Sequence, residues 1–359
     1  MLCTPIPLPR ATVCMRDTPV MVAHATVGEV DPMLETAKER VGVFKIRHGE
    51  AAWKERAARV DRPVHLADTT TTPVSRAYFK LVEILRTCAI RVSNRSLHIC
   101  EAPGGFAQAV MGDTSCKDII VMSRKCGGAA HFAPAIMRDA RVCVLNDLPC
   151  ASDLLHKAVR DEVVRSAAGS DLVTADGAID NDAQPEIAEA MTASLIFHQI
   201  DTAIRAQKTG GSFVLKVFGM ALQLTRECIA ILTTCYETVS IVKPFTSRAV
   251  NDERYIVCQN FIAPPELPRI SDENGLYIES IARVNDDWLQ HLQKVIHDMR
   301  LVQRQAIHAA LTCTFRDESA ASRPHRPRRP GQTQGRGGPY SRGRGRPQTR
   351  ESSPGNTTK

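Results

Sequence analysis

The chain has 359 residues, of which 43% are hydrophobic and 24% are charged, and its net charge is +7. Both shares are close to those of globular proteins, so the composition excludes a collagen, a coiled coil and a chain that is disordered throughout. The length allows one large domain with additions, or two domains. No apolar stretch approaches a membrane-spanning length and prolines interrupt the N-terminus, so we expect a soluble intracellular protein of the nucleus or cytoplasm, without membrane contact.

The 12 cysteines are scattered along the chain without a Cys-x-x-Cys pair or a nearby pair of histidines. Zinc sites need such clusters, and a chain of this size does not depend on a disulfide framework. Most of the cysteines lie inside apolar runs, where a reduced thiol packs as a small hydrophobic group. We therefore expect a reducing compartment and no bound metal.

The first 60 residues divide into two parts. Residues 1–30 are interrupted by prolines and show no pattern, so we interpret them as an arm. Residues 33–60 mix apolar and charged residues with a moderate helical period, which predicts one or two helices. Thr72-Pro-Val-Ser75 then resembles the start of a further helix, whose apolar face extends to Leu85.

Short apolar runs alternate with helical stretches in the middle of the chain. Seven runs have the length and the β-branched residues of strands: 96–100, 118–122, 142–145, 171–175, 212–217, 239–242 and 254–258. Four stretches between them have helical length and spacing: 106–111, 152–167, 185–207 and 220–236. This alternation predicts an α/β fold with a seven-stranded, mostly parallel sheet and helices on both faces. In such sheets ligands bind beyond the carboxyl ends of the strands.

The C-terminal part changes in character. Residues 270–316 carry apolar residues at helical spacing and are interpreted as a helical appendage. Residues 319–359 hold nine Arg and one Lys against one Glu, with many Gly and Pro, so this segment cannot form a core and is predicted to be a disordered tail. Arg/Gly segments bind RNA through phosphate contacts and stacking, and a solubilising or targeting tail is the alternative.

The predicted organisation therefore has four parts. An N-terminal arm and helical extension (1–70) precedes the α/β domain (71–265), which is followed by the helical appendage (266–318) and the basic tail (319–359).

The first strand of the predicted sheet ends in the loop Glu101-Ala-Pro-Gly-Gly-Phe106, which is followed by a helix. Two adjacent glycines let the backbone approach a ligand closely, and a helix N-terminus presents free N–H groups. The loop lacks the Gly-x-Gly-x-x-Gly spacing of dinucleotide sites and the Gly-Lys-Ser/Thr of phosphate loops, which argues against NAD and ATP. By itself, a Gly-Gly pair predicts only a turn.

Together with its neighbours, the loop resembles the FtsJ-like family of S-adenosylmethionine-dependent RNA ribose 2′-O-methyltransferases. Five similar motifs follow one another in the order of that family: Ser75-Arg-Ala-Tyr-Phe-Lys80-Leu, Ala102-Pro-Gly-Gly-Phe106, Asp171-Leu-Val-Thr-Ala-Asp176-Gly, Gly210-Gly-Ser-Phe-Val-Leu-Lys216 and the stretch from Lys243-Pro-Phe-Thr-Ser-Arg248 to Glu253-Arg-Tyr. Each motif alone is weak, but the ordered set is specific. The resemblance covers residues 73–262 and implies a Rossmann-like methyltransferase fold, S-adenosylmethionine as cofactor and RNA as partner.

The resemblance implies a catalytic tetrad of Lys80, Asp176, Lys216 and Glu253. Methylation of a ribose needs an alcohol made nucleophilic and placed in line with an electrophilic methyl group. We expect Lys216 to act as the base or to steer the hydroxyl, Lys80 to be its like-charged neighbour, and the two carboxylates to position the amines. A lysine inside the apolar run 212–218 favours this role independently, because burying a charge without a partner costs free energy. Taken alone, Lys80 fits a solvated helix face and Asp176 a turn.

The resemblance also implies a set of cofactor-binding residues: Ala102, Pro103, Gly104, Gly105, Phe106, Asp147 and Asp176. Asp147 follows the third predicted strand and matches the position that contacts adenine in the family, or it simply belongs to an Asp-Leu-Pro turn. The second strand ends in Met122-Ser-Arg-Lys125, where many methyltransferases have an acidic residue for the cofactor ribose. The contact to the ribose is therefore left open.

Two short matches point to a branch of the family. Asp176-Gly-Ala and Cys100-Glu-Ala-Pro-Gly-Gly-Phe look more like the enzymes of eukaryotes and large DNA viruses that methylate the ribose of the mRNA cap than like bacterial ribosomal enzymes. We therefore expect the first transcribed nucleotide of capped mRNA as substrate, with capping or transcription machinery as a candidate partner. Two alternatives stay open: a ribosomal or transfer RNA 2′-O-methyltransferase, and a catalytically silent RNA-binding relative.

Overall fold

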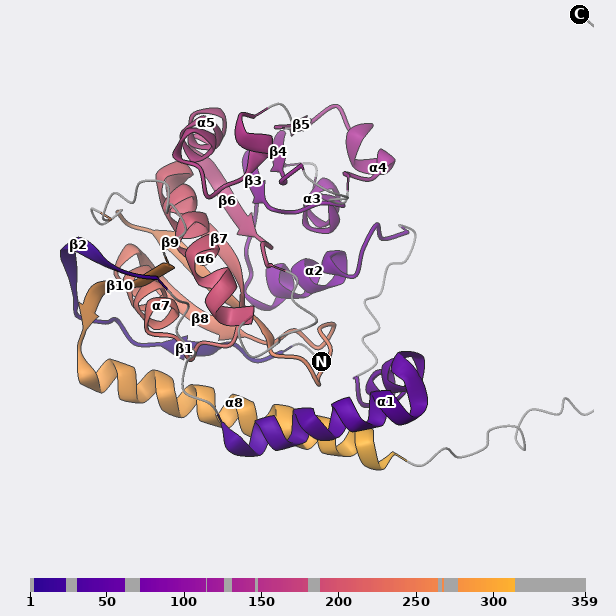
Figure 1. Cartoon of the computed structure of the whole chain (residues 1–359). Helices are drawn as coiled ribbons and strands as arrows, with labels where there is room; N and C mark the ends of the chain where they lie inside the picture. The colour runs from indigo at the N-terminus through magenta and orange to yellow at the C-terminus, as the bar shows by residue number, and fades with distance from the viewer. Residues whose placement is uncertain are drawn as a thin grey trace, which may run out of the picture. The chain divides into compact units, whose positions relative to one another are not determined.

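The computed structural model describes residues 3–23, 31–61, 72–113, 115–125, 131–145, 148–179, 188–263, 267 and 277–313 (Figure 1). None of the helices in these ranges is long and apolar enough to cross a bilayer. The predicted basic tail, residues 319–359, lies outside the described residues.

An eight-stranded sheet forms the centre of the structure, in the order β1-β8-β9-β7-β6-β3-β4-β5. Its strands in chain order are β1 (Ile6–Leu8), β3 (Arg95–Ile99), β4 (Asp118–Met122), β5 (Val142–Val144), β6 (Ser170–Ala175), β7 (Gln207–Phe218), β8 (Tyr236–Val242) and β9 (Glu253–Phe261). Hydrogen-bonded neighbours among β3 to β7 are parallel, whereas β9 is antiparallel to both β7 and β8. Each of the seven predicted runs overlaps one strand from β3 to β9, which confirms the mostly parallel α/β sheet.

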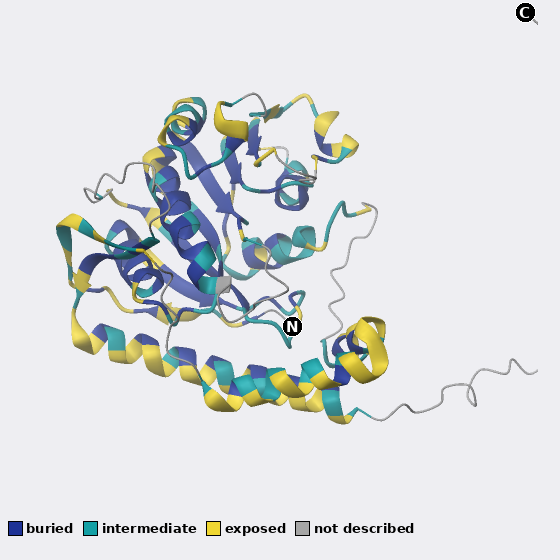
Figure 2. Cartoon of the chain, in the orientation of Figure 1, coloured by how far each residue is buried: buried dark blue, intermediate teal, exposed yellow. Residues whose placement is uncertain are grey.

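Helices cover both faces of this sheet because side chains alternate along each strand. In β6, Leu172 belongs to the core shared with α2 (Ala77–Thr87) and α3 (Gly105–Met111). The next residue, Val173, belongs to the core on the other face. That core is shared with α5 (Lys157–Ala167), α6 (Ala188–Ala206) and α7 (Gln223–Cys235). Figure 2 shows the buried sheet between these helices.

The predicted N-terminal arm is wrong, because residues within it form two strands. β1 pairs with β8 at the edge of the large sheet, and β2 (Val13–Val22) pairs antiparallel with β10 (Tyr277–Val284). β10 lies in the segment interpreted as a helical appendage, which therefore contains a strand before its long helix, residues 286–312. Both pairings join residues far apart in the sequence, such as Ile6 with Ile241 and Val22 with Tyr277, and a local hydrophobic pattern carries no signal for such pairs.

Two long helices complete the described part of the chain. α1 (Pro32–Val60) is capped by Asp31, interrupted at Gly49, where φ is +87°, and packed beside α8 (Asp286–Thr312) (Figure 1). The interruption agrees with the prediction of one or two helices. The contact between α1 and α8 buries Trp53 and Ala310, while their outer surfaces are exposed (Figure 2).

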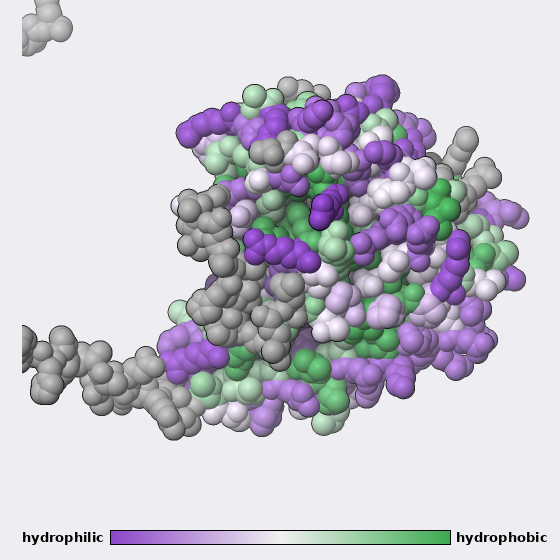
Figure 3. All heavy atoms as spheres, turned by 180° about the vertical axis from the view of Figure 1, so that it is seen from behind, coloured by the Kyte–Doolittle hydropathy of each residue, from purple (hydrophilic) through white to green (hydrophobic). Residues whose placement is uncertain are grey.

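Two shorter helical segments, α4 (Pro134–Met137) and the 3-10 turn Cys150–Ser152, flank β5 on either side in the sequence. The surface seen from behind has hydrophobic residues gathered mainly in its middle, between hydrophilic margins (Figure 3).

Candidate active site

The predicted site residues come from four elements that meet at one end of the central strands. Asp176 directly follows β6 and Lys216 lies near the end of β7, a neighbouring parallel strand. Glu253 begins β9 and pairs in register with Phe218, so it faces the same end of β7. Lys80 reaches this end from the second turn of α2. The carboxyl ends of parallel strands are where ligands bind in such folds.

The structure brings the four predicted residues together as two ion pairs. Lys216 Nζ lies 3.0 Å from Asp176 Oδ1 and also donates to the Asp176 backbone carbonyl. Lys80 Nζ donates to Glu253 Oε2 at 2.8 Å. The exposed fractions of the four side chains lie between 7% and 19%, so solvent screens these pairs only in part. Each amine is therefore fixed by its own carboxylate, and each of the four side chains keeps a small exposed fraction.

The two carboxyl groups differ in their electrostatic environment. Burial raises the pKa of Asp176 above its ordinary value, and the attraction of Lys216 and Lys80 opposes that rise. Burial acts in the same direction on Glu253, but the charge and hydrogen bond of Lys80, with the Ser247 hydroxyl, outweigh it and lower the pKa of Glu253. The surroundings of Glu253 thus favour its charged form, whereas burial disfavours the charged form of Asp176.

The loop after β3 requires its two glycines. Gly104 has φ = +111°, and a Cβ added there would lie 2.4 Å from Ile136 Cγ1. A Cβ on Gly105 would lie 2.3 Å from Ser75 Oγ and 2.9 Å from Tyr78 N, so only glycine allows α3 to pack this closely against the start of α2. These contacts hold the loop and the helix that carries Lys80 in a fixed relation.

The remaining predicted cofactor residues differ in their surroundings. Ala102 and Pro103 lie in the same loop, directly before the glycines. The Phe106 side chain is fully buried and its ring centroid lies 6.0 Å from that of Tyr255, while its backbone N–H donates to the Glu101 carboxylate. Phe106 therefore belongs to the core through its side chain. Asp147 lies outside the described residues.

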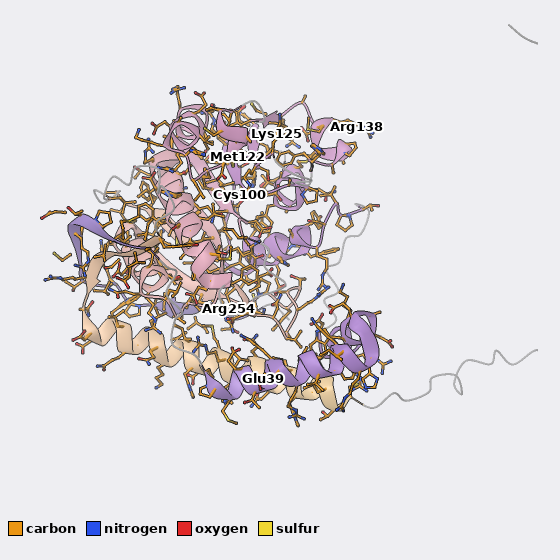
Figure 4. The ribbon with its side chains drawn as sticks, in the orientation of Figure 1. Glu39, Cys100, Met122, Lys125, Arg138 and Arg254 are labelled. Atoms are coloured by element: carbon orange, nitrogen blue, oxygen red, sulfur yellow. The ribbon has the colours of Figure 1, made fainter. Side chains whose placement is uncertain are left out.

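The end of β4 carries basic residues, as the sequence indicates. Arg124 forms an ion pair with Asp153 at 3.1 Å, and the Lys125 backbone N–H donates to Ala151 O. In Figure 4, Cys100, Met122 and Lys125 lie in the part of the molecule formed by β3, β4 and β5, apart from Arg254. Within the described ranges, no group of three or more His, Cys, Asp or Glu side chains is arranged to hold a metal ion.

Sequence reasoning missed several side chains that organise the site. Ser247 donates to Glu253 Oε1 at 2.8 Å, and Lys243 donates to the Glu253 backbone carbonyl at 2.8 Å. Buried Glu83, on α2, accepts from the N–H groups of Phe245 and Thr246. Lys243 and Ser247 lie inside the last of the five motifs, between two buried strands. Their polar side chains at this place in the sequence were the signal that could have indicated a role in the site.

Comparisons with known proteins agree with the motifs. A family model described as FtsJ-like methyltransferase matches residues 73–261. "Cap-specific mRNA (nucleoside-2′-O-)-methyltransferase 2" of Drosophila melanogaster is 28% identical over 271 residues, which make up 67% of this chain and 39% of that protein. The chain thus spans about two fifths of the length of this relative. "Cap-specific mRNA (nucleoside-2′-O-)-methyltransferase" of Autographa californica nuclear polyhedrosis virus is 26% identical over 239 residues, 66% of this chain and 90% of that protein.

Among solved structures, a ribosomal RNA methyltransferase from Plasmodium falciparum matches with a TM-score of 0.38 and 18% identity, over 53% of this chain and 98% of that one. The family model covers more than half of the chain. The chain therefore belongs to the FtsJ-like methyltransferase family.

Proposed function

We propose that this protein transfers a methyl group from S-adenosylmethionine to the ribose 2′-oxygen of RNA, at the first transcribed nucleotide of capped mRNA. The observation that carries the proposal is the pair of contacts Lys216–Asp176 and Lys80–Glu253 beside the Gly104–Gly105 loop. The names of the fly and viral relatives support capped mRNA over ribosomal or transfer RNA as the substrate.

FtsJ-like methyltransferases use S-adenosylmethionine, and the residues of this chain fit that cofactor. It carries an ammonium and a sulfonium group, and carboxylate oxygens favour both. Among the described residues, Oε2 of buried Glu101 has no hydrogen-bond partner, and Asp176 stands at the end of the strand next to β3. The backbone from Ala102 to Gly105 would hold the methionine part and Asp176 would lie near the sulfonium, while Asp147 is the candidate for the adenine. When bound, the cofactor supplies an electrophilic methyl group.

The chain's own residues would then act on the acceptor hydroxyl. Lys216 would direct a lone pair of the 2′-hydroxyl toward the methyl carbon as an ammonium or, in its neutral amine form, accept the hydroxyl proton, and Asp176 would fix the direction of the Lys216 amine. Lys80, held by Glu253, would contribute a second cationic group on the α2 side of the ribose. Such prepositioned groups lower the barrier because their orientation is fixed before the reaction begins.

Methyl transfer from labelled S-adenosylmethionine to matched capped and uncapped RNAs, followed by nuclease digestion, tests the proposal. We expect label on the ribose next to the cap. Lys216→Ala should reduce transfer by about 10²- to 10⁴-fold, the range for a lost proton-transfer group. Lys208→Ala is the matched control, because Lys208 lies on the same strand and also pairs with an aspartate, at 2.8 Å from Asp171, but at the opposite end.

Each other result would change a different part of the proposal. Label only in uncapped RNA would favour the ribosomal or transfer RNA branch. Cofactor binding without transfer would favour a catalytically silent relative. Full activity of a folded Lys216→Ala variant would refute the assignment of Lys216.

A further inference from the structure

We propose that Lys243 is a positioning residue for this reaction, which holds Glu253, and through Glu253 the amine of Lys80, in its working orientation. The inference rests on the proposed function. It concerns a lysine outside the predicted tetrad that contacts the backbone carbonyl of Glu253, whereas Lys80 contacts its carboxylate.

The contacts of Lys243 are directed into its own loop. The residue directly follows β8 and begins the loop that returns to Glu253 and β9. Its amine donates to Glu253 O at 2.8 Å and to Asn251 O at 3.0 Å, and it also contacts the Asn251 side-chain oxygen. An ammonium has three protons to donate, and the four acceptors within reach, which include Ser247 Oγ, share them within the protein. Lys243 therefore closes the loop and fixes the backbone at Glu253.

A second path leads from Lys243 to the Glu253 side chain. Lys243 Nζ lies 3.2 Å from Ser247 Oγ, which accepts this hydrogen bond and donates its own proton to Glu253 Oε1 at 2.8 Å. The other oxygen, Glu253 Oε2, accepts from Lys80 at 2.8 Å. Both the backbone and the carboxylate of Glu253 are thus held by Lys243, directly or through Ser247. Loss of this amine would free Glu253 to leave Lys80.

The surroundings of Lys243 disfavour the charged form of its amine. Burial and the repulsion of Arg254 lower the pKa of Lys243 to about 7, although Glu253 and Asp252 oppose the decrease and Lys80 adds to it. A buried cation next to two others costs free energy, so the hydrogen bonds to the loop are what the residue contributes. This supports a positioning role for Lys243 over one in contact with the substrate.

A matched set of variants of the full chain tests the role. Lys243→Met removes the donor at similar length, and Lys243→Gln restores two N–H donors. Ser247→Ala interrupts only the path to the carboxylate. Lys117→Met is the control, because Lys117 is exposed just before β4. We expect Lys243→Met to lower kcat by about tenfold to a hundredfold, as a displacement of up to an ångström does, and Lys243→Gln to recover part of it. KM for RNA and the calorimetric Kd for S-adenosylmethionine should stay within about twofold.

A double-mutant cycle separates positioning from a general loss of stability. If Lys243 acts through Glu253, Lys243→Met should change kcat by less than about twofold in a Glu253→Gln background. Multiplicative effects of the two substitutions would overturn the proposal. Should Lys243→Met fail to fold, the same cycle with Ser247→Ala decides, with the same expected coupling.

A crystal structure of Lys243→Met gives a readout that does not depend on activity. We expect the Glu253 carboxylate to have left Lys80. A retained Lys80–Glu253 ion pair would overturn the inference even if kcat falls. If the wild-type protein methylates no RNA, the proposed function fails, and this structural comparison still decides whether Lys243 holds Glu253.

Discussion

Replacement of Gly105 by alanine tests whether the glycine loop and the helix that carries Lys80 are held together by direct packing. The added Cβ would lie 2.3 Å from Ser75 Oγ, 2.9 Å from Ala77 Cβ and 2.9 Å from Tyr78 N. The Ser75 hydroxyl can rotate away. Ala77 and Tyr78 belong to the first turn of α2, so α2 or the loop must move.

The size of the movement follows from these distances. Ordinary contacts of a Cβ begin at 3.4 Å, so the two α2 atoms must recede by at least about half an ångström. Overpacking of this kind costs about 1–3 kcal/mol of unfolding free energy. Because Lys80 lies one turn further along α2, the same shift changes its position relative to the loop. We expect kcat/KM for methyl transfer to fall about tenfold.

Gly112→Ala is the matched control at the other end of α3. Gly112 has φ = −66°, and the nearest atom to an added Cβ is Ala109 O at 3.8 Å, so alanine fits without movement. This variant should keep full activity and gain about 0.4–1 kcal/mol of stability through the unfolded state. Denaturant unfolding and initial transfer rates measure both quantities. Wild-type stability and activity in Gly105→Ala would refute the argument that α2 packs directly on the loop.

Three further predictions address the dependence of stability on pH, the loop between β8 and β9, and the basic tail. Burial lowers the pKa of His98 to about 3, so the unfolded chain binds its proton first as the pH falls below 6.5, and stability decreases. His98→Gln should remove about 2 kcal/mol of the loss in unfolding free energy between pH 7 and pH 5, whereas an unchanged pH dependence would contradict the role of His98. Glu83→Gln should lower the free energy of unfolding by about 1–3 kcal/mol, because Glu83 accepts from Phe245 and Thr246 in a buried site, and thermal unfolding at neutral pH measures it. Deletion of residues 319–359 should weaken RNA binding and flatten its dependence on salt without changing cofactor affinity, and an unaltered salt dependence would leave the tail a targeting role.

The strands that could be predicted are those whose own residues carry the signal. β6 and β7 are buried between helices on both faces, so nearly every residue of their core stretches is apolar or β-branched. β2 has no such signature, because it contains Arg16, Asp17 and Pro19 and, among the described strands, pairs with β10 alone. Its pairing depends on β10, which lies far away in the sequence, and local periodicity does not contain that information.

The sequence predicts which residues form the site, but not which lysine pairs with which carboxylate. The motifs supplied Lys80, Asp176, Lys216 and Glu253, yet nothing in their spacing shows which amine meets which carboxylate. That choice is made by the register of β9 on β7, which sets Glu253 opposite Phe218. Phe106 shows a different limit of the motifs. Its position in the motif predicted a cofactor contact, but its side chain packs in the core.

The segments outside the family match take part in holding Glu253 in place. The loop from Lys243 to Glu253 lies within residues 73–261, but two of its backbone groups are bound by residues beyond those limits. The N–H of Ala249 donates to Asp61 Oδ1 at 2.9 Å, and Gln303 Nε2 on α8 donates to Val250 O at 3.1 Å. A loop whose hydrogen bonds are completed from α8 and from the end of α1 is less free to move than the family segment alone would allow. α8 and the residue that ends α1 therefore help to fix the loop that leads to Glu253.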